Sequence, residues 1–186
     1  SIYGKTFSFY TDNGVFAKNG LDYGSRLLLL NIPLSEIKGT LLDVGCGYGA
    51  LGIILASSTG VAVTMIDINK RALKLAALNS KLNKIENITI KESDCYQEIK
   101  EKYDTIVTNP PIRAGKKVVY KILREASEYL KPNGKLYFVI HKDQGAKSIV
   151  SDLKDLYNIT IIERKKGFFI IRAENCWLVA WIMLII

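Results

Sequence analysis

The sequence predicts an α/β fold in which a seven-stranded, mostly parallel sheet carries helices on both faces. From Thr40 onward, short runs of β-branched residues alternate with longer helical patterns, which is typical of parallel strands joined by crossover helices. The chain has 186 residues, of which 48% are hydrophobic and 24% are charged. This length allows one substantial core and is too short for two ordinary domains, so we expect a single domain.

Seven runs rich in β-branched and aromatic residues predict the strands, at residues 40–44, 61–66, 88–91, 103–108, 135–140, 159–163 and 168–172. Only four residues, 164–167, separate the last two runs. Such a connection forms a hairpin and is too short for a parallel crossover. We therefore expect the final strand to run antiparallel to the others.

Between these strands, apolar residues recur at helical spacing and predict helices at residues 50–57, 69–82, 114–130 and 144–156. Glycine or asparagine marks the joins, for example at Gly60, Asn87 and Gly167. Residues 1–38 differ from the rest, because aromatic residues and glycines lead there into a short helix near 21–30.

Composition limits the class of protein. Lys and Arg exceed Asp and Glu by 26 − 18 = 8, which favours a polyanionic partner, with solvated surface lysines as the structural alternative. Cys46, Cys95 and Cys176 are odd in number and lack CxxC spacing, so neither a disulfide framework nor a zinc site is indicated. Since no secretory signal opens the chain, we expect a reducing, cytoplasmic location.

The chain ends in an uncharged apolar run of 11 residues, 176–186. A membrane-spanning helix needs about 20 residues, so no membrane association is expected. The tail has three open interpretations: a sequence or cloning artefact, a packed extension, and an apolar patch for dimerisation. The sequence does not fix the oligomeric state, and a monomer is the simpler expectation.

The first predicted strand runs into a glycine-rich turn, Asp43-Val44-Gly45-Cys46-Gly47-Tyr48-Gly49. A glycine turn that opens a helix lets the backbone approach a ligand closely and directs free N–H groups toward it. The spacing Gly45-x-Gly47-x-x-Ala50 also fits the relaxed dinucleotide fingerprint. The structural alternative is a tight turn whose small residues serve packing alone.

Asp67 ends the second predicted strand, 20 residues after Gly47, where a carboxylate can accept hydrogen bonds from both hydroxyls of a ribose. A nicotinamide dinucleotide and S-adenosylmethionine (SAM) both satisfy this arrangement. Alternatively, Asp67 belongs to the cap of the helix that begins near Asn69. Asp94 and Cys95 follow the third strand, where a solvated loop carboxylate is the structural alternative.

The segment Asn109-Pro110-Pro111-Ile112 follows the fourth predicted strand. The side-chain carbonyl of Asn109 and the backbone carbonyl of Pro110 can both accept hydrogen bonds from an –NH₂ group, which orients a weakly nucleophilic planar amine. Holding the amine in line with a methyl donor accelerates transfer by positioning, and no metal is needed. The structural alternative is that the prolines only end the strand.

Together these segments resemble class I methyltransferases, and specifically the short relatives of the bacterial small-subunit ribosomal RNA guanine-N2 methyltransferases. The resemblance runs from about Phe9 to Arg172 and includes the segments 14–16, 21–28, 43–49 and 109–116. It implies a Rossmann-like fold with SAM as cofactor. The implied cofactor-binding residues are Asp43, Gly45, Cys46, Gly47, Gly49, Asp67, Asp94 and Cys95.

The resemblance also implies that Asn109 and Pro110 are catalytic and that Phe16, Pro111, Ile112, Arg113 and Lys116 contact the substrate. Many amino-methyltransferases carry Tyr or Phe where this chain has Ile112, so we expect Phe16 to stack on the target base instead. Arg113, Lys116, Lys117, Lys121 and Arg124 are well placed to bind phosphates, although an ordinary solvated helix face explains them as well. We expect residues 164–166 to be plain surface and His141 to be structural.

The sequence thus predicts one methyltransferase domain over residues 1–174, in which residues 1–38 form a cap over the cofactor site and 39–174 form the core, with 175–186 outside the fold. The expected activity is SAM-dependent methylation of an exocyclic amine of RNA, namely guanine N2 of 16S rRNA in the small ribosomal subunit. Adenine-N6 methylation, protein glutamine methylation and a non-catalytic RNA-binding relative stay open. An NAD-dependent oxidoreductase is disfavoured, because no residue after the fourth strand supplies the acid for hydride transfer.

Overall fold

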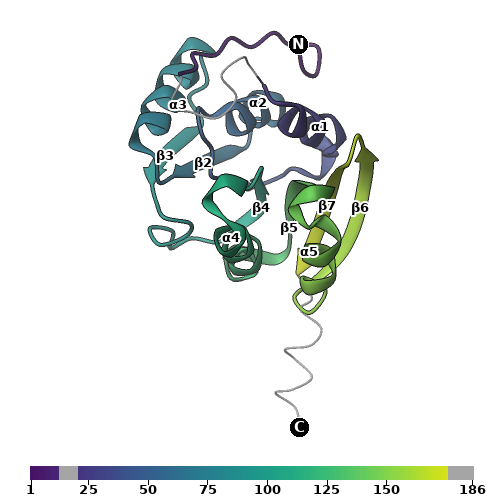
Figure 1. Ribbon diagram of the computed structural model, residues 1–186. Helices are drawn as coiled ribbons and strands as arrows, with labels where there is room; N and C mark the ends of the chain where they lie inside the picture. Colours follow the sequence, from purple (N-terminus) through teal and green to yellow (C-terminus); the bar gives the residue numbers. More distant parts are fainter. Residues whose placement is uncertain (13–20, 176–186) are drawn as a thin grey trace.

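The computed structural model describes residues 1–12 and 21–175, so Phe16 and the apolar run 176–186 lie outside the described residues. Its centre is one seven-stranded sheet in the order β3-β2-β1-β4-β5-β7-β6 (Figure 1). The strands are β1 (Thr40–Val44), β2 (Ala62–Asp67), β3 (Ile88–Glu92), β4 (Tyr103–Thr108), β5 (Leu130–His141), β6 (Tyr157–Lys165) and β7 (Phe168–Asn175). Strands β1 to β5 pair in parallel, and β7 is antiparallel to both β5 and β6, as predicted.

Helices cover both faces of the sheet (Figure 1). One face carries α1 (Tyr23–Asn31), α2 (Ala50–Thr59) and α3 (Lys70–Leu82), and the other carries α4 (Lys116–Tyr129) and α5 (Ala146–Asp152). Leu28 of α1 and Ile53 of α2 are buried between the first group and the sheet. Leu123 of α4 and Phe138 of β5 are buried on the other side. The sheet therefore has two apolar cores, one on each side.

Strands β1 and β4 have the predicted bounds, whereas other elements differ. Helix α5 is shorter than the predicted 144–156 at both ends: Gly145, with a left-handed φ of 82°, separates it from a short 3₁₀ turn, Lys142–Gln144, and the helix already ends at Asp152. Strand β5 begins five residues earlier than predicted, and its pairing with β4 shifts register between Tyr103 and Thr105. These differences depend on local backbone geometry that hydrophobic periodicity does not encode.

The hairpin between β6 and β7 is tighter than predicted. Its turn consists of Lys166 (φ 49°) and Gly167 (φ 81°), and two positive φ values are typical of a type I′ turn, whose twist matches that of the strands. Strand β7 continues to Asn175, whose side chain donates to the carbonyl of Ser127 over 3.0 Å. The last strand thus extends one residue beyond the predicted domain end at 174.

The N-terminal segment packs along the helices of the first face. The backbone N–H of Tyr10 donates to Asn79 of α3 over 2.7 Å, and the side chain of Asn79 also donates to the carbonyl of Tyr48 in the glycine turn. Helix α1 forms part of the covering layer, since Leu28 and Leu29 are fully buried, and only its first turn reaches the cavity described below. In the part of the chain that the structure describes, no helix combines the length and apolar character needed to cross a membrane.

Candidate active site

A cavity of about 780 Å³ opens at the carboxyl ends of β1, β2, β4 and β5. Strand β1 neighbours β2 on one side and β4 on the other, so the chain reverses its order across the sheet at this point. Open α/β sheets bind ligands at such a switch point, and small-molecule sites typically enclose about 300–1,000 Å³. The predicted site residues that line the cavity are Gly45, Cys46, Gly47, Asp67, Asp94, Cys95, Asn109, Pro110, Pro111, Ile112 and Arg113.

The glycine turn is held in place by strand β2. The N–H groups of Gly45 and Cys46 both donate to the carbonyl of Ile66 over 2.9 Å, and the N–H of Gly47 donates to Asp67 Oδ2 over 2.9 Å. Gly47 has a φ of 56°, and a Cβ atom there would point into open space. The turn therefore leaves room for a ligand to lie directly against its backbone.

Asp67 has both carboxylate oxygens fixed by backbone donors. Oδ2 accepts from Gly47, and Oδ1 accepts from the N–H of Asn69 over 2.8 Å. Asn69 itself is the N-cap of α3, where its side chain accepts from Arg71 and Ala72. Asp67 is therefore not the N-cap itself but supports the N-cap residue, and its carboxylate also lines the cavity with lone pairs that can accept further hydrogen bonds.

Asp94 and Cys95 line the cavity after β3, together with Ser93. The hydroxyl of Ser93 donates to the carbonyl of Cys95 over 2.8 Å, so it shapes this loop, a role the sequence did not reveal. Burial raises the pKa of the Cys95 thiol to about 11 and the pKa of Cys46 further above its ordinary value. Both cysteines are thus neutral thiols that form walls and carry no thiolate chemistry.

Asp43 and Gly49 are not among the residues that line the cavity, and their contact with the cofactor stays a prediction. Asp43 is fully buried beneath the turn, where Oδ2 accepts from the N–H of Gly52 over 2.9 Å. Its Oδ1 has no hydrogen-bond partner among the described residues, and burial raises the pKa of this carboxyl to about 7. A Cβ atom at Gly49 would meet Ala76 Cβ and Ile53 Cδ1 at 3.1 Å, so Gly49 allows α2 to pack on α3.

Asn109 lines the side of the cavity that is formed by the start of α1, and its amide orientation is fixed. Its Nδ2 donates to Ser25 Oγ over 2.9 Å and to Asp22 Oδ1 over 3.2 Å, and Asp22 is also the N-cap of α1. An ionised carboxylate can only accept hydrogen bonds, so the –NH₂ side of the amide must face Asp22. This arrangement leaves the carbonyl oxygen of Asn109 available to a ligand.

The two prolines continue this surface. The carbonyl of Pro111 accepts from the N–H of Ala114 over 2.9 Å, whereas no described residue donates a hydrogen bond to the carbonyl of Pro110. The Cδ atom of Pro111 lies 3.8 Å from the position of a Cβ atom on Gly45. The glycine turn and the Asn-Pro-Pro segment are therefore immediate neighbours, although about 60 residues separate them in sequence.

Two aromatic rings that the sequence analysis did not assign also line the cavity, Tyr23 and Phe168. Their centroids are 5.4 Å apart, and Tyr23 is 37% exposed. Phe168 also packs against the ring of His141, whose Nδ1 accepts from the N–H of Asp143. His141 thus has a structural role here, and the two aromatic rings line the same cavity as Ile112.

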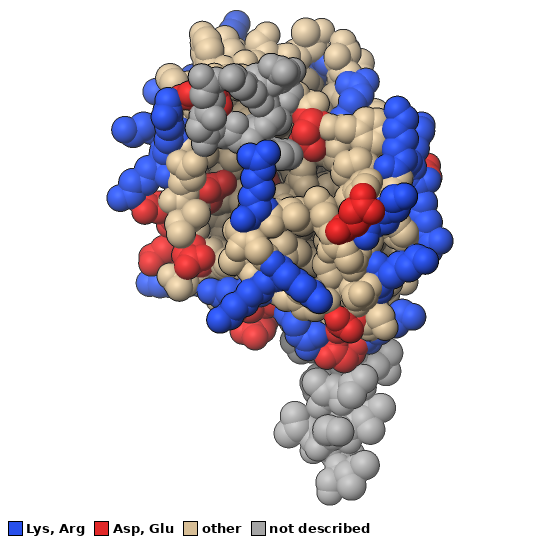
Figure 2. Space-filling view, in the orientation of Figure 1, with Lys and Arg blue, Asp and Glu red and all other residues tan. Residues whose placement is uncertain are grey.

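The β6–β7 hairpin reaches the rim of this site, contrary to the expectation that residues 164–166 are plain surface. Lys166 Nζ lies 5.2 Å from the centroid of the Tyr23 ring. Figure 2 shows many Lys and Arg side chains along the right-hand edge of this face, where Figure 1 places the hairpin. The cavity therefore has basic residues near both the hairpin and the start of α4.

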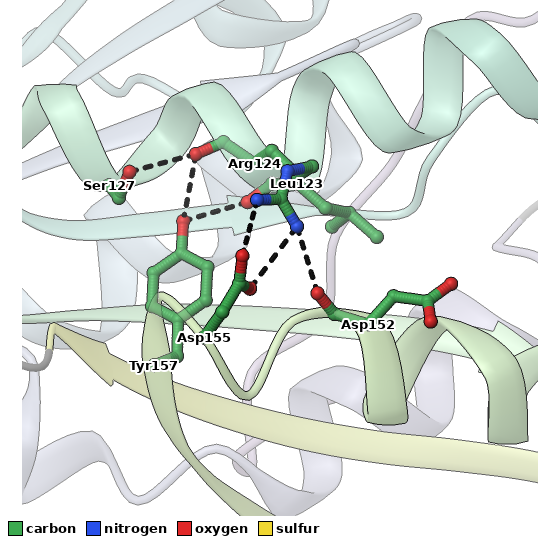
Figure 3. Close-up of polar contacts among 6 residues, drawn as sticks. All are labelled: Leu123, Arg124, Ser127, Asp152, Asp155 and Tyr157. Carbon is green, nitrogen blue, oxygen red and sulfur yellow. Dashed lines mark hydrogen bonds and ion pairs between the residues drawn. The ribbon is translucent and has the colours of Figure 1, made fainter.

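The basic residues at α4 have different roles. Arg113 lines the cavity, whereas Lys116 and Lys117 are exposed beside it and do not line it. Arg124 belongs to a structural network: it pairs with Asp155 over 2.6 Å and donates to the carbonyl of Asp152 over 2.8 Å (Figure 3). The guanidinium of Arg124 thus joins α4 to the end of α5 and the segment that follows it, which favours a structural role over the predicted phosphate contact.

Comparison with known proteins places these features in a family. The Methyltransferase small domain profile matches residues 6–172. A Bacillus subtilis (strain 168) protein described as "Uncharacterized protein YbxB" is 44% identical over 175 residues, which cover 92% of this chain and 87% of that protein. "Ribosomal RNA small subunit methyltransferase C" of Aeromonas hydrophila subsp. hydrophila is 39% identical over 131 residues, 68% of this chain. The chain spans only 37% of the length of that relative.

Solved structures show the same fold. The T. thermophilus 16S rRNA N2 G1207 methyltransferase, solved in complex with AdoMet and guanosine, has a TM-score of 0.83 at 23% identity, over 94% of this chain and 48% of that chain. Ribosomal protein L11 methylase from Lactobacillus delbrueckii subsp. bulgaricus has a TM-score of 0.72 at 23% identity, over 84% and 80% of the two chains. The predicted Rossmann-like fold is confirmed, and because the family profile covers nearly the whole described fold, this chain belongs to the Methyltransferase small domain family.

Proposed function

We propose that this protein transfers the methyl group of SAM to the N2 amine of a guanine in 16S rRNA of the small ribosomal subunit. The observation that carries this proposal is the orientation of Asn109, whose –NH₂ is held by Asp22 and Ser25 and whose oxygen stays available beside the glycine turn. Family membership and the similarity to ribosomal RNA methyltransferases support the choice of reaction and substrate.

The donors and walls of the cavity fit SAM. Gly47 leaves open space against the backbone, and the carboxylates of Asp67 and Asp94 can accept hydrogen bonds from ribose hydroxyls and from an adenine amine. Ile68 is 64% exposed at the cavity wall and offers an apolar surface for a planar ring. When bound there, SAM supplies an electrophilic methyl group.

Asn109 and Pro110 act on the amine that receives the methyl group. The lone pair of an exocyclic amine is delocalised into the base, so the amine is a poor nucleophile. The oxygens of Asn109 and Pro110 accept its two N–H groups, which aims the nitrogen and favours its pyramidal, nucleophilic form. Positioning of this kind lowers the barrier because the cost of alignment is met on binding.

The surroundings of the site suit a base taken out of an RNA stack. A base modified on its amino edge must leave the helix, and flanking phosphates then hold the strand. Tyr23 and Phe168 provide rings on which the base can stack, and Phe16 stays a prediction for the same role. Arg113 lines the cavity, Lys166 lies over the ring of Tyr23 and Lys116 begins α4, and these three residues would hold the phosphates of rRNA in the cytoplasm.

The test is transfer of labelled methyl groups to small ribosomal subunits and total RNA from a strain that lacks this gene, followed by nucleoside analysis. N2-methylguanosine in 16S rRNA is the expected product. N6-methyladenosine in RNA, or methylated glutamine in protein, would show that adenine or glutamine is the target and not guanine. RNA binding without any SAM affinity in calorimetry would overturn the catalytic proposal and support a non-catalytic RNA-binding protein.

A further inference from the structure

We propose that Asp22 selects guanine over the other amine-bearing substrates by accepting a hydrogen bond from guanine N1–H. This inference rests on the proposed function and adds a specificity residue to it. Asp22 lines the cavity and contacts the amide of Asn109 directly, with Asp22 Oδ1 3.2 Å from Nδ2. The acceptor that faces the target amine therefore has a carboxylate as its neighbour.

The candidate substrates differ in the group next to their amine. In guanine the N2 amine is flanked by N1–H, so two donors stand side by side. In adenine the N6 amine is flanked by the unprotonated N1, in cytosine the N4 amine is flanked by N3, and in glutamine the amide –NH₂ is flanked by its carbonyl, so each presents a donor beside an acceptor. Enzymes that extrude a base read this edge by hydrogen bonds.

The acceptors in the cavity match the guanine pattern. Asp22 Oδ1 accepts from the N–H of Ser25 over 3.0 Å and from Asn109, whereas Oδ2 has no partner among residues 1–12 and 21–175. No salt bridge within these residues involves Asp22, so its negative charge has no paired cation there. A carboxylate placed beside an unprotonated ring nitrogen or a carbonyl is repelled, and the half-buried acceptors are left unpaired.

A variant of Ser25 can distinguish two roles of Asp22, the selection of guanine and the mere support of Asn109. Both Asp22 and Ser25 accept from Asn109 Nδ2, but only Asp22 presents a second oxygen that a base can use. Removing the Ser25 hydroxyl loosens Asn109 without changing the charge of the site. Asp22→Asn keeps a good N-cap for α1 and replaces the carboxylate with an amide that can donate to a ring nitrogen.

The experiment compares the binding of guanosine and 2-aminopurine riboside by NMR titration in the presence of S-adenosylhomocysteine. 2-Aminopurine keeps the 2-amino group and has an unprotonated N1. We expect the wild-type protein to bind guanosine about 10-fold or more tightly than 2-aminopurine riboside. In Asp22→Asn this ratio falls by about 10-fold or more, whereas in Ser25→Ala it stays at the wild-type value. Asp22→Ser, which also caps helices well, provides a second uncharged variant if the first does not fold.

An unchanged ratio in the folded Asp22 variants, or a wild-type protein that binds guanosine no better than 2-aminopurine riboside, overturns the inference. If the Asp22 variants bind both nucleosides more weakly by the same factor, Asp22 only supports Asn109, and this result likewise overturns the inference. Methyl transfer by the wild-type protein to small ribosomal subunits is measured alongside. Absence of N2-methylguanosine there rejects the proposed function, whereas its presence with an unchanged ratio rejects the selection by Asp22 alone.

Discussion

The two ends of the cavity are built in different ways. The cofactor end comes from one stretch of chain, in which the glycine turn, Asp67 and the loop at Asp94 follow three neighbouring strands. The amine end combines the start of α1, the segment after β4 and the start of β7, and its contact between Asp22 and Asn109 joins residues 87 positions apart. A continuous motif can be recognised in sequence, whereas an assembled site depends on how distant elements pack.

The two ends also differ in what holds them. Backbone hydrogen bonds to Ile66 fix the glycine turn, so no single side chain supports it alone. Asn109 is held through side chains, by Asp22 and Ser25. We therefore expect single substitutions to affect the amine end more severely than the cofactor end, and the predictions below test this difference in order of decreasing effect.

Replacing Asn109 with Ala should slow methyl transfer by about 10²–10³-fold, the scale observed when one preorganised polar contact is lost from an active site. SAM affinity measured by calorimetry should stay within about twofold of wild type, because Asn109 lies at the amine end. Asn158→Ala, on β6 and away from the cavity lining, is the control. An unchanged rate in the Asn109 variant would remove this residue from the mechanism.

Asp43 should make stability depend on pH. Burial raises its pKa from 3.8 to about 7, so between these values the folded protein holds a proton that the unfolded chain releases. Stability attributable to this group is therefore lost as pH rises, by on the order of 2–3 kcal/mol between about pH 5 and 8. Urea unfolding at both pH values should show this loss in the wild type and its absence in Asp43→Asn. Equal pH dependence in the two proteins would contradict the prediction.

Removing the Asp67 carboxylate should weaken SAM binding by about 10-fold to 100-fold, the scale for lost hydrogen bonds to a charged group. Asp67→Ala also removes the acceptor for Gly47 N–H, so the turn becomes less ordered. Calorimetric titration with SAM measures the effect. Glu86→Ala removes an exposed carboxylate that does not line the cavity and should bind SAM normally. Comparable losses in the two variants would indicate a general charge effect.

The smallest expected effects concern the basic residues. Lys116→Gln and Lys117→Gln should each lower the slope of log affinity against log salt for rRNA by about 1, because each removes one phosphate contact. Arg124→Gln should leave that slope unchanged and lower the melting temperature slightly, since Arg124 pairs with Asp155 in an exposed ion pair. A lower slope in the Arg124 variant would instead show that Arg124 contacts an RNA phosphate.

Much of the fold could be predicted because its signals are local. Strands β1 and β4 are buried, β-branched runs bounded by turn residues, and their bounds were predicted correctly. The antiparallel direction of β7 followed from the short connection to β6. The start of α5 depends on the left-handed conformation of Gly145, which apolar spacing does not encode.

For the same reason, some residues of the site could be predicted from the sequence and others could not. Gly47, Asp67 and Asp94 follow successive strands and line the cavity as expected. Asp43 belongs to the same motif but points beneath the turn, because the last residues of a strand alternate between faces. Asp22 and Phe168 reach the cavity through the packing of α1 and the pairing of β7. Asp22 lies in the segment 21–28 that carries the family resemblance, but no local pattern there predicts its contact with Asn109.

The position of β7 has a consequence for synthesis. This strand lies between β5 and β6 in the sheet, and it is the last strand of the described chain to leave the ribosome. Until it emerges, β6 has no neighbour that joins it to the sheet, and the cavity lacks the wall formed by Phe168. Domains fold as units during synthesis, so the amine end of the cavity is completed only when the sheet closes.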